Sequence, residues 1–366
     1  MRVMIVIDQV YRAGSERNAV SLARALVHRG HQVSFNVTRD LLPIDEAMES
    51  ELFEVGIQIH RHHLEPVARN GLRSVSGLRA EMIRFRPDVV QAFLARSHLL
   101  AALAVRGVRR RDRPALVISR RAQVSDDIGG VGERFARGTS LALADGIIAN
   151  SDAVLAESVD LERVGDRPRV VIPNMIEPRF FETVRPAPID SDLPVLVNVA
   201  NLRHPKGQET LIRAAAVLRD EGRPVTVVLV GEGELESHLR ALAAELEVDV
   251  RFAGAVADVR PYLARAEVYV HPSDAEGMPN AILEAAAAGR PVVATDVGGV
   301  RDAIGAAGRL VPPGRPDLLA KAVAGLLADP ARHDALGRAA HHRALDFSEE
   351  AFVTAHLEFY DSVRRG

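Results

Sequence analysis

Short apolar runs alternate with amphipathic stretches from the beginning of the chain. Residues 3–7 are continuously apolar, which is typical of a strand buried on both faces. Apolar residues return at helical spacing over residues 19–26, and Gly30 stands where such a helix would end. Residues 33–37 then alternate between apolar and polar as a second strand. Strand, helix and strand in this order predict the start of a parallel sheet.

The same rhythm continues and restarts once. Further strands are expected at residues 87–93, 115–119, 145–150, 170–172, 195–200, 225–230, 250–252, 268–271 and 292–295. Residues 183–194 carry three prolines and no apolar period, so they are the best candidate for a linker. We expect an α/β protein of two doubly wound Rossmann-like domains, over residues 1–185 and 186–350. A final helix over residues 351–365 is expected to pack back on the first domain.

Length and composition narrow the class of protein. The chain has 366 residues, more than the roughly 250–300 that one core usually holds, which also favours two domains. No apolar run approaches the roughly 18–20 residues of a membrane span, and charge follows the first apolar run too soon for a signal peptide. There is no cysteine, hence no disulfide and no thiolate metal site. A cytoplasmic protein is expected.

Charged residues are distributed unevenly along the chain. The net charge is only −3, so a nucleic-acid partner is not expected. The arginines nevertheless gather in one short stretch, at Arg106, Arg109, Arg110, Arg111 and Arg113. This stretch is either an ordinary solvated loop or a contact for an anionic membrane surface or a phosphorylated acceptor. A membrane contact would place the protein at the inner face of the membrane.

The loop after the first strand of the second domain holds a candidate anion clamp. The chain has only two lysines, Lys206 and Lys321, so a lysine kept in this loop raises a functional question. Arg203 and Lys206 stand after a strand and before a helix, where two cations can clamp a diphosphate. The alternative is an ordinary basic loop.

Two glutamates follow the strand expected at residues 268–271. Glu276 is expected in the loop at the carboxyl end of that strand, and Glu284 inside the next helix. Backbone amides near Gly277 and Met278, at the helix start, would bind an anion. A glutamate beside that site suits a neutral polyol, so the segment suits a ligand that joins a phosphate to a sugar. Solvent-exposed glutamates on a loop and a helix are the alternative.

These segments together resemble glycosyltransferase family four, the retaining enzymes with the GT-B fold, whose two domains face each other across a cleft. Residues 13–17 resemble the opening motif of that family, with Ala13 in place of a glycine. Residues 118–121 resemble the SERN strand end of its polysaccharide and glycan-assembly branch. There, Arg120 replaces a glutamate and Ala122 an asparagine.

The second domain carries the most specific part of the resemblance. Arg203 and Lys206 match the basic pair of the family, and Glu276 with Glu284 match its E-x7-E motif. By position, the resemblance implies three catalytic residues, Glu276, Lys206 and Arg203. It implies that the donor is bound by Gly14, Arg203, Lys206, Gly254, Val256, Glu276, Gly277, Met278, Asn280 and Glu284. It also makes Arg121 a candidate on the acceptor side.

The resemblance further implies the reaction. A sugar would pass from a nucleotide sugar, with a UDP-hexosamine or UDP-hexose favoured, to a glycan or lipid-linked acceptor. Cations and helix amides can stabilise the leaving diphosphate, so neither a metal nor another cofactor is expected. No second carboxylate offers itself as a nucleophile, which favours front-face substitution. A nucleotide-sugar epimerase of related fold and a non-catalytic two-domain solute-binding protein are the alternatives.

Overall fold

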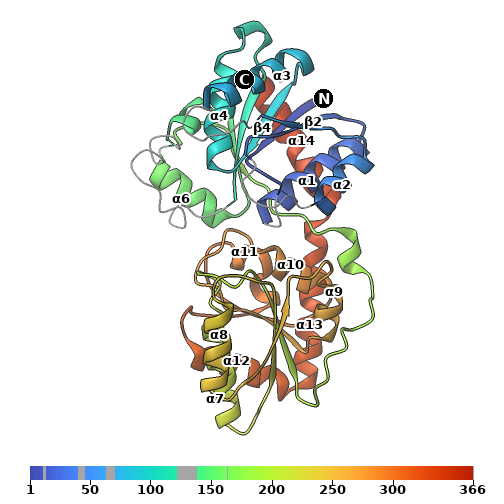
Figure 1. The fold of residues 1–366 in the computed structure, drawn as a ribbon, viewed down its shortest axis with the longest axis vertical. Coiled ribbons are helices and arrows are strands. Elements are labelled where there is room, and N and C mark those ends of the chain that lie inside the picture. The colour runs from blue at the N-terminus through green and yellow to red at the C-terminus, as the bar shows by residue number, and fades with distance from the viewer. Residues whose placement is uncertain (11–13, 40–45, 63–70, 122–137, 163, 366) are drawn as a thin grey trace. The chain divides into compact units, whose positions relative to one another are not determined.

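A computed structural model describes residues 1–10, 14–39, 46–62, 71–121, 138–162 and 164–365. They divide into two compact units, Met1–Met175 with Glu349–Gly366, and Ile176–Ser348 (Figure 1). The boundary between the two units lies before residue 185, at which the sequence suggested that the first domain ends. Its physical reason is that Ile176 and Phe180 are buried in the core of the second unit. Of the family-motif residues, Ala13 and Ala122 lie outside the described part of the chain.

The described strands of the first unit form one parallel sheet in the order β3-β2-β1-β4-β5-β6-β7. The strands are β1 (Arg2–Ile7), β2 (Gln32–Val37), β3 (Ile59–Arg61), β4 (Val89–Phe93), β5 (Ala115–Arg120), β6 (Gly146–Ala149) and β7 (Arg169–Val171). The helices are α1 (Gly14–His28), α2 (Glu46–Glu54), α3 (Gly71–Phe85), α4 (Ala95–Arg106), α6 (Asp152–Glu162) and α14 (Glu349–Arg365).

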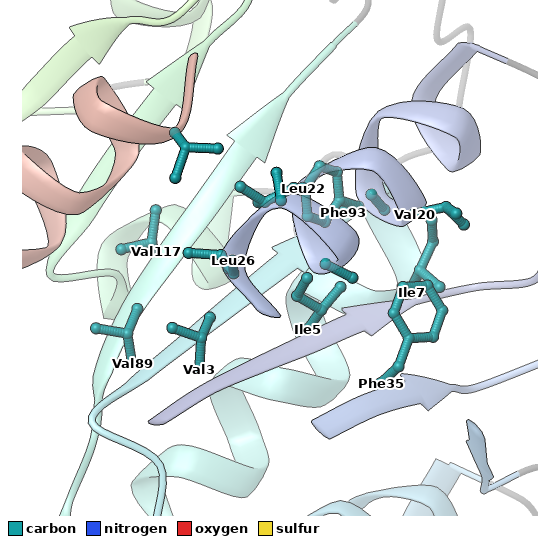
Figure 2. Packing of buried hydrophobic residues seen from close by; sticks show 14 of the residues in the cluster. Val3, Ile5, Ile7, Val20, Leu22, Leu26, Phe35, Val89, Phe93 and Val117 are labelled. Atoms are coloured by element: carbon teal, nitrogen blue, oxygen red, sulfur yellow. The ribbon is translucent and has the colours of Figure 1, made fainter. Parts of the chain in front are cut away.

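Both faces of this sheet are covered, which explains the continuous apolar run in β1. Val3, Ile5 and Ile7 face a core that contains residues of α1, α2 and α14 (Figure 2). Met4 and Val6 point to the opposite face and meet residues of α3 and α4. Alternate side chains of one strand therefore enter two different cores, as expected of a parallel sheet between helices.

The last helix, α14, completes the first unit although it follows the second unit in the sequence. Phe352, Phe359 and Val363 lie in the same core as β1 and α1. The hydroxyl of Tyr360, which is fully buried, donates a hydrogen bond to Oε1 of Gln91 on β4. This is the unit on which the sequence suggested that the final helix would pack.

The second unit repeats the architecture with a sheet in the order β10-β9-β8-β11-β12-β13. All of its strand pairs are parallel. The strands are β8 (Val195–Val199), β9 (Thr226–Val230), β10 (Asp249–Gly254), β11 (Val268–His271), β12 (Val292–Thr295) and β13 (Arg309–Val311). The helices are α7 (Gln208–Asp220), α8 (Glu236–Glu245), α9 (Arg260–Arg265), α10 (Asn280–Ala287), α11 (Val300–Ile304), α12 (Pro316–Leu327) and α13 (Pro330–Ala344).

Helices cover both faces of the second sheet as well. Residues of α7, α8 and α12 pack on one face, and those of α9, α10 and α13 on the other (Figure 1). Within the described residues, every helix is too short or too polar to cross a lipid bilayer.

Candidate active site in the second unit

The strand order of the second sheet places two loops side by side. The chain runs from β8 outward through β9 and β10, then returns to β11 on the other side of β8. Ligands of such sheets bind where the order reverses, outside the carboxyl ends of the strands. Residues 200–207, after β8, and residues 272–279, after β11, therefore share the favoured position. A hydrogen bond of 2.8 Å from the Asp274 amide to the Pro205 carbonyl joins them.

Glu276 is the centre of this site. Its Oε1 accepts hydrogen bonds from Nζ of Lys206 and Nε2 of His271, both at 2.7 Å, and from Oγ of Ser273 at 2.8 Å. Its Oε2 has no hydrogen-bond partner among the described residues. The whole residue is only 8% exposed, so the contacts of this carboxylate are set by its surroundings.

These contacts keep Glu276 ionised. Burial by itself raises the pKa of the carboxyl group, but the hydrogen bond and charge of His271 and then those of Lys206 outweigh it. The pKa falls to about 2. The group is therefore a carboxylate that only accepts hydrogen bonds at neutral pH.

Two polar residues of β11 support Glu276, and the sequence analysis missed both. Nδ1 of His271 lies 3.2 Å from the hydroxyl of Tyr269, and the two rings are stacked. Both side chains are buried, with 2% and 0% of their surface exposed. The available signal was the alternation of Tyr269, His271 and Ser273 through an otherwise apolar strand end, which puts all three on one side.

The basic pair lies in one tight turn. The Lys206 amide donates to the Arg203 carbonyl at 2.9 Å. Lys206 is bound to Glu276, whereas the exposed Arg203 side chain has no hydrogen bond or ion pair with any described residue. The turn thus presents one cation that is paired with Glu276 and one that is open to solvent.

Helix α10 carries the second glutamate of the motif. Asn280 begins the helix after Pro279, while Gly277 and Met278 are buried just before it. Met278 packs into the core, so its backbone rather than its side chain is offered to a ligand. Burial and then the charge of Glu284 raise the pKa of Tyr269, to which the charge of Glu276 also contributes. The two glutamates therefore lie near the same tyrosine.

A third loop adjoins the first two. Gly254, at the end of β10, accepts a 2.9 Å hydrogen bond from the Gly231 amide. Val256 follows and packs against the core of the second unit. The Gly231 backbone approaches Ala200 so closely that a Cβ at position 231 would collide with the Ala200 carbonyl. The ends of β8, β9 and β10 are thus held together.

Gly14 and Arg121 belong to the first unit. Gly14 is exposed at the start of α1, and its carbonyl accepts a 2.7 Å hydrogen bond from Asn18. Arg121, directly after β5, donates through Nε to Ser119 at 3.1 Å and through Nη1 to Asn174 at 2.7 Å. Its guanidinium also lies over the ring of Phe93.

Arg121 is a buried cation that pairs with no carboxylate of the described residues. Its Nη2 is buried and has no hydrogen-bond partner within the described residues. Burial lowers the pKa of the guanidinium to about 10, while Tyr360 acts in the opposite sense. Because a buried charge normally has a partner, this side chain is unusual at the carboxyl edge of a sheet.

Possible metal ligands are dispersed in the described part of the chain. It contains no group of three or more His, Asp or Glu side chains placed to hold an ion. The pair Asp190 and Asp192 precedes β8 and so stands at the amino edge of the sheet, opposite the site.

Known proteins resemble this chain in sequence over both units. Residues 12–180 match the family described as Glycosyltransferase Family 4, and residues 193–329 match Glycosyl transferases group 1. The lipopolysaccharide core biosynthesis glycosyltransferase LpsE of Rhizobium meliloti is 31% identical over 74% of this chain and 82% of its own length. A D-inositol 3-phosphate glycosyltransferase of Kineococcus radiotolerans is 35% identical over 59% of this chain and 57% of its own length.

Solved structures share the fold. HepE of Anabaena, determined with UDP-glucose, is 22% identical and superposes with a TM-score of 0.81, over 99% of this chain and 100% of that one. Sucrose-phosphate synthase of Thermosynechococcus elongatus is 20% identical, with a TM-score of 0.81 over 99% of both chains. Two parallel-sheet α/β units and these matches confirm the expected GT-B fold. The chain belongs to the glycosyltransferases of family four.

Proposed function

We propose that this glycosyltransferase is retaining and metal-independent, and that it moves a hexose or N-acetylhexosamine from its UDP derivative to a glycan or lipid-linked acceptor. One observation carries the proposal: an ionised, buried Glu276 whose Oε1 accepts three hydrogen bonds and whose Oε2 has no partner among the described residues, with Lys206 beside it. Such an oxygen can accept a hydrogen bond from a neutral donor, and a sugar hydroxyl is a donor of this kind. The solved relatives bound to UDP and UDP-glucose support the choice of nucleotide.

In this proposal the diphosphate is held by cations and backbone amides. Arg203, which is free of described partners, and Lys206 neutralise it, with the amides of Gly277, Met278 and Asn280 near its phosphate. Charge on the leaving oxygens grows as the bond to the sugar breaks. Preorganised donors therefore stabilise the transition state more than the bound substrate.

The neighbouring loops are proposed to contact the rest of the donor. Glu284 accepts the ribose hydroxyls, and the backbone from Gly254 to Val256 reads the base. Gly14 of the first unit approaches the donor phosphate. These assignments follow the family motif residue by residue, and the closeness of Glu276 and Glu284 to Tyr269 supports the first of them.

The proposed chemistry is front-face substitution. The bond between the anomeric carbon and the phosphate oxygen breaks, and its electron pair goes to the diphosphate. The acceptor hydroxyl forms the new bond on the same face and gives its proton to the departing phosphate. Glu276 is a poor nucleophile for the alternative route, because three donors already bind one oxygen and its pKa is about 2.

The acceptor is proposed to meet the first unit. Arg121 ends a strand at the carboxyl edge of the sheet and keeps a guanidinium nitrogen without a described partner. That nitrogen suits a hydroxyl or an anionic group of the acceptor. The named relatives act in lipopolysaccharide core synthesis and on inositol 3-phosphate, which supports a glycan or a phosphorylated acceptor.

We propose that the protein works at the cytoplasmic face of the membrane. A basic surface on the first unit supports this contact. Arg106, Arg109 and Arg110 are exposed, and none of them has an acidic partner in the described residues. Arg111 pairs with Asp112, and Arg113 donates to the carbonyls of Arg106 and Val108.

Apolar side chains accompany these arginines. Leu103, one turn before Arg106 on α4, is 45% exposed, and Ile83 on the adjacent α3 is 59% exposed. Cations flanking exposed apolar side chains suit the surface of an anionic bilayer.

A donor screen tests the proposed function. The protein is incubated with UDP-glucose, UDP-N-acetylglucosamine, GDP-mannose and ADP-glucose, with and without lipid-linked glycan, and nucleoside diphosphate release is measured. We expect release with a UDP-sugar that depends on the acceptor and yields a glycosylated product. Epimerised donor without transfer, or tight binding without turnover, would overturn the proposal.

A further inference from the structure

Three buried polar side chains lie at the end of β11, and two of them, His271 and Ser273, donate to one oxygen of Glu276. Tyr269, His271 and Ser273 are 0%, 2% and 0% exposed. The alternating residues Val268 and Val270 belong to the apolar core on the other face. Polar groups are costly to bury without partners, so this strand end is built around the carboxylate that it contacts.

The direction of each hydrogen bond follows from the charge of Glu276. A carboxylate only accepts, so Nε2 of His271 and Oγ of Ser273 both donate to Oε1. On the other side of the ring, Nδ1 of His271 lies 3.2 Å from the hydroxyl of Tyr269, which itself donates to the Val199 carbonyl at 3.5 Å. Tyr269 thereby holds the orientation of the His271 ring.

Lys206 is the least constrained of the three donors to Glu276. Its side chain is 21% exposed, against 3% for His271. In the proposed function, which this inference presupposes, Lys206 also serves the diphosphate. A donor that has to serve two anions cannot by itself keep the carboxylate in one orientation.

We propose that His271, oriented by Tyr269, is a positioning residue that holds Oε1 of Glu276 so that Oε2 stays turned to the donor sugar. Ser273 assists from the loop directly after that strand. When Lys206 turns to the diphosphate, these two buried donors remain, and the carboxylate keeps its place. His271 thereby contributes to recognition of the sugar, and not to binding of the nucleotide.

Two substitutions separate this role from simple packing. In His271→Gln, the amide nitrogen reaches about as far as Nε2 of the imidazole and can still donate to Glu276. In His271→Asn, the shorter side chain reaches only the position of Nδ1. Both variants remove the ring, so a loss caused by packing alone would affect them equally.

The first measurement is calorimetric binding of UDP, UDP-glucose and UDP-N-acetylglucosamine. We expect His271→Asn to weaken binding of the preferred UDP-sugar at least tenfold while UDP binding changes less than twofold. His271→Gln should recover most of that loss. Equal losses for UDP and UDP-sugar, or equal losses in the two variants, would overturn the role of His271. A wild type that binds no UDP-sugar more tightly than UDP would instead contradict the proposed donor.

The second measurement needs no donor. The carboxyl carbon of Glu276 is followed by NMR between pH 3 and pH 7, with Glu276→Gln used to assign its signal. Loss of the His271 hydrogen bond should raise the pKa of Glu276, so its signal should titrate within this range in His271→Asn but not in the wild type or His271→Gln. An Asn variant that behaves as the wild type would overturn the proposal even if the donor is another nucleotide sugar. If His271→Asn fails to fold, Ser273→Ala is expected to raise the pKa of Glu276 as well, to a smaller extent. An unchanged pKa in Ser273→Ala would count against the proposal.

Discussion

Gly207 lies directly against the carbonyl group of Pro272, and this close approach joins the loop of Lys206 to the loop of Glu276. A Cβ at position 207 would collide with the Pro272 oxygen and lie 2.9 Å from its carbonyl carbon. The φ angle of Gly207 is +67°, which favours glycine for a second reason. The hydrogen bond between Nζ of Lys206 and Oε1 of Glu276 therefore depends on a residue that has no side chain.

Gly207→Ala is expected to reduce activity through this contact. The new methyl group would push the two loops apart, and we expect kcat/KM to fall at least tenfold, which is about 1.4 kcal/mol of transition-state stabilisation. Gly222→Ala is the matched control, because its φ of +73° is similar but a Cβ there meets nothing within 4 Å. Both variants should lose about 1 kcal/mol of unfolding free energy through backbone strain, and Gly207→Ala should lose more because its methyl group also meets the Pro272 carbonyl. Equal activities in the two variants would argue against the contact.

Lys206→Ala is expected to lower kcat/KM about 100-fold or more, that is, by roughly 3 kcal/mol, since it removes a cation from the leaving diphosphate. Lys321→Ala is a direct control, because it removes the other lysine of the chain, exposed on α12. Glu284→Ala should lower kcat/KM to a similar extent, because it removes the carboxylate that is proposed to accept the ribose hydroxyls of the nucleotide. Steady-state kinetics alongside thermal unfolding checks both variants, and full turnover in folded Lys206→Ala would refute the assignment.

The ionisation of Glu276 predicts a pH dependence of stability. Its folded pKa of about 2 lies below the ordinary 4.5, so the native contacts of the carboxylate stabilise the protein above pH 4.5. This contribution, about 3 kcal/mol, is lost as the pH falls from 4.5 toward 2. Urea unfolding of the wild type and Glu276→Gln from pH 7 to pH 3 measures it. The difference between them should shrink below pH 4.5, and a constant difference would contradict the pKa shift.

Charge reversal on α4 and the following turn tests membrane contact. Vesicles rich in phosphatidylglycerol should bind the protein, and those of phosphatidylcholine should not. Replacing Arg106, Arg109 and Arg110 by Glu should weaken binding at least 30-fold, since each cation near an anionic surface contributes about 1 kcal/mol. The same change at Arg213, Arg332 and Arg338, which are exposed in the second unit, is the matched control. Equal losses in both triple variants would indicate a non-specific charge effect.

Chelation and product stereochemistry test the mechanism. Turnover should persist at the same rate after dialysis against EDTA, because cationic side chains and amides are proposed to neutralise the diphosphate. NMR of the product should show the anomeric configuration of the donor. Loss of activity that Mg²⁺ or Mn²⁺ restores would contradict metal independence. An inverted product would exclude front-face substitution.

Most of the fold could be predicted because its strands carry continuous apolar runs. β8, β9, β11 and β12 all lie within a residue of the stretches expected for them. The edge strands β3 and β13 were missed, since three residues of moderate burial give no measurable period. Residues 176–185 were placed in the wrong unit, because proline content marks a connection but not the core into which Ile176 and Phe180 fold.

The candidate site could be predicted as a set of residues but not as a set of contacts. Lys206 and Glu276 were named separately, from the chemistry of their loops. Their hydrogen bond exists because β8 and β11 are neighbours in the sheet. The order of the strands in a sheet cannot be predicted from the local periodicity of apolar residues. His271 was missed for a related reason. A lone histidine in an apolar strand has no evident purpose until its partner, Glu276, is known.

Helix α14 has a consequence for how the protein is made. The first core cannot close until residues as late as Phe359 and Val363 have been synthesised, because they pack beside β1 and β6. The second unit, by contrast, is continuous from Ile176 to Ser348 and can fold as soon as that stretch has left the ribosome. The unit translated first is therefore the one finished last, and until then the apolar side chains that α14 covers in the finished protein lack this cover.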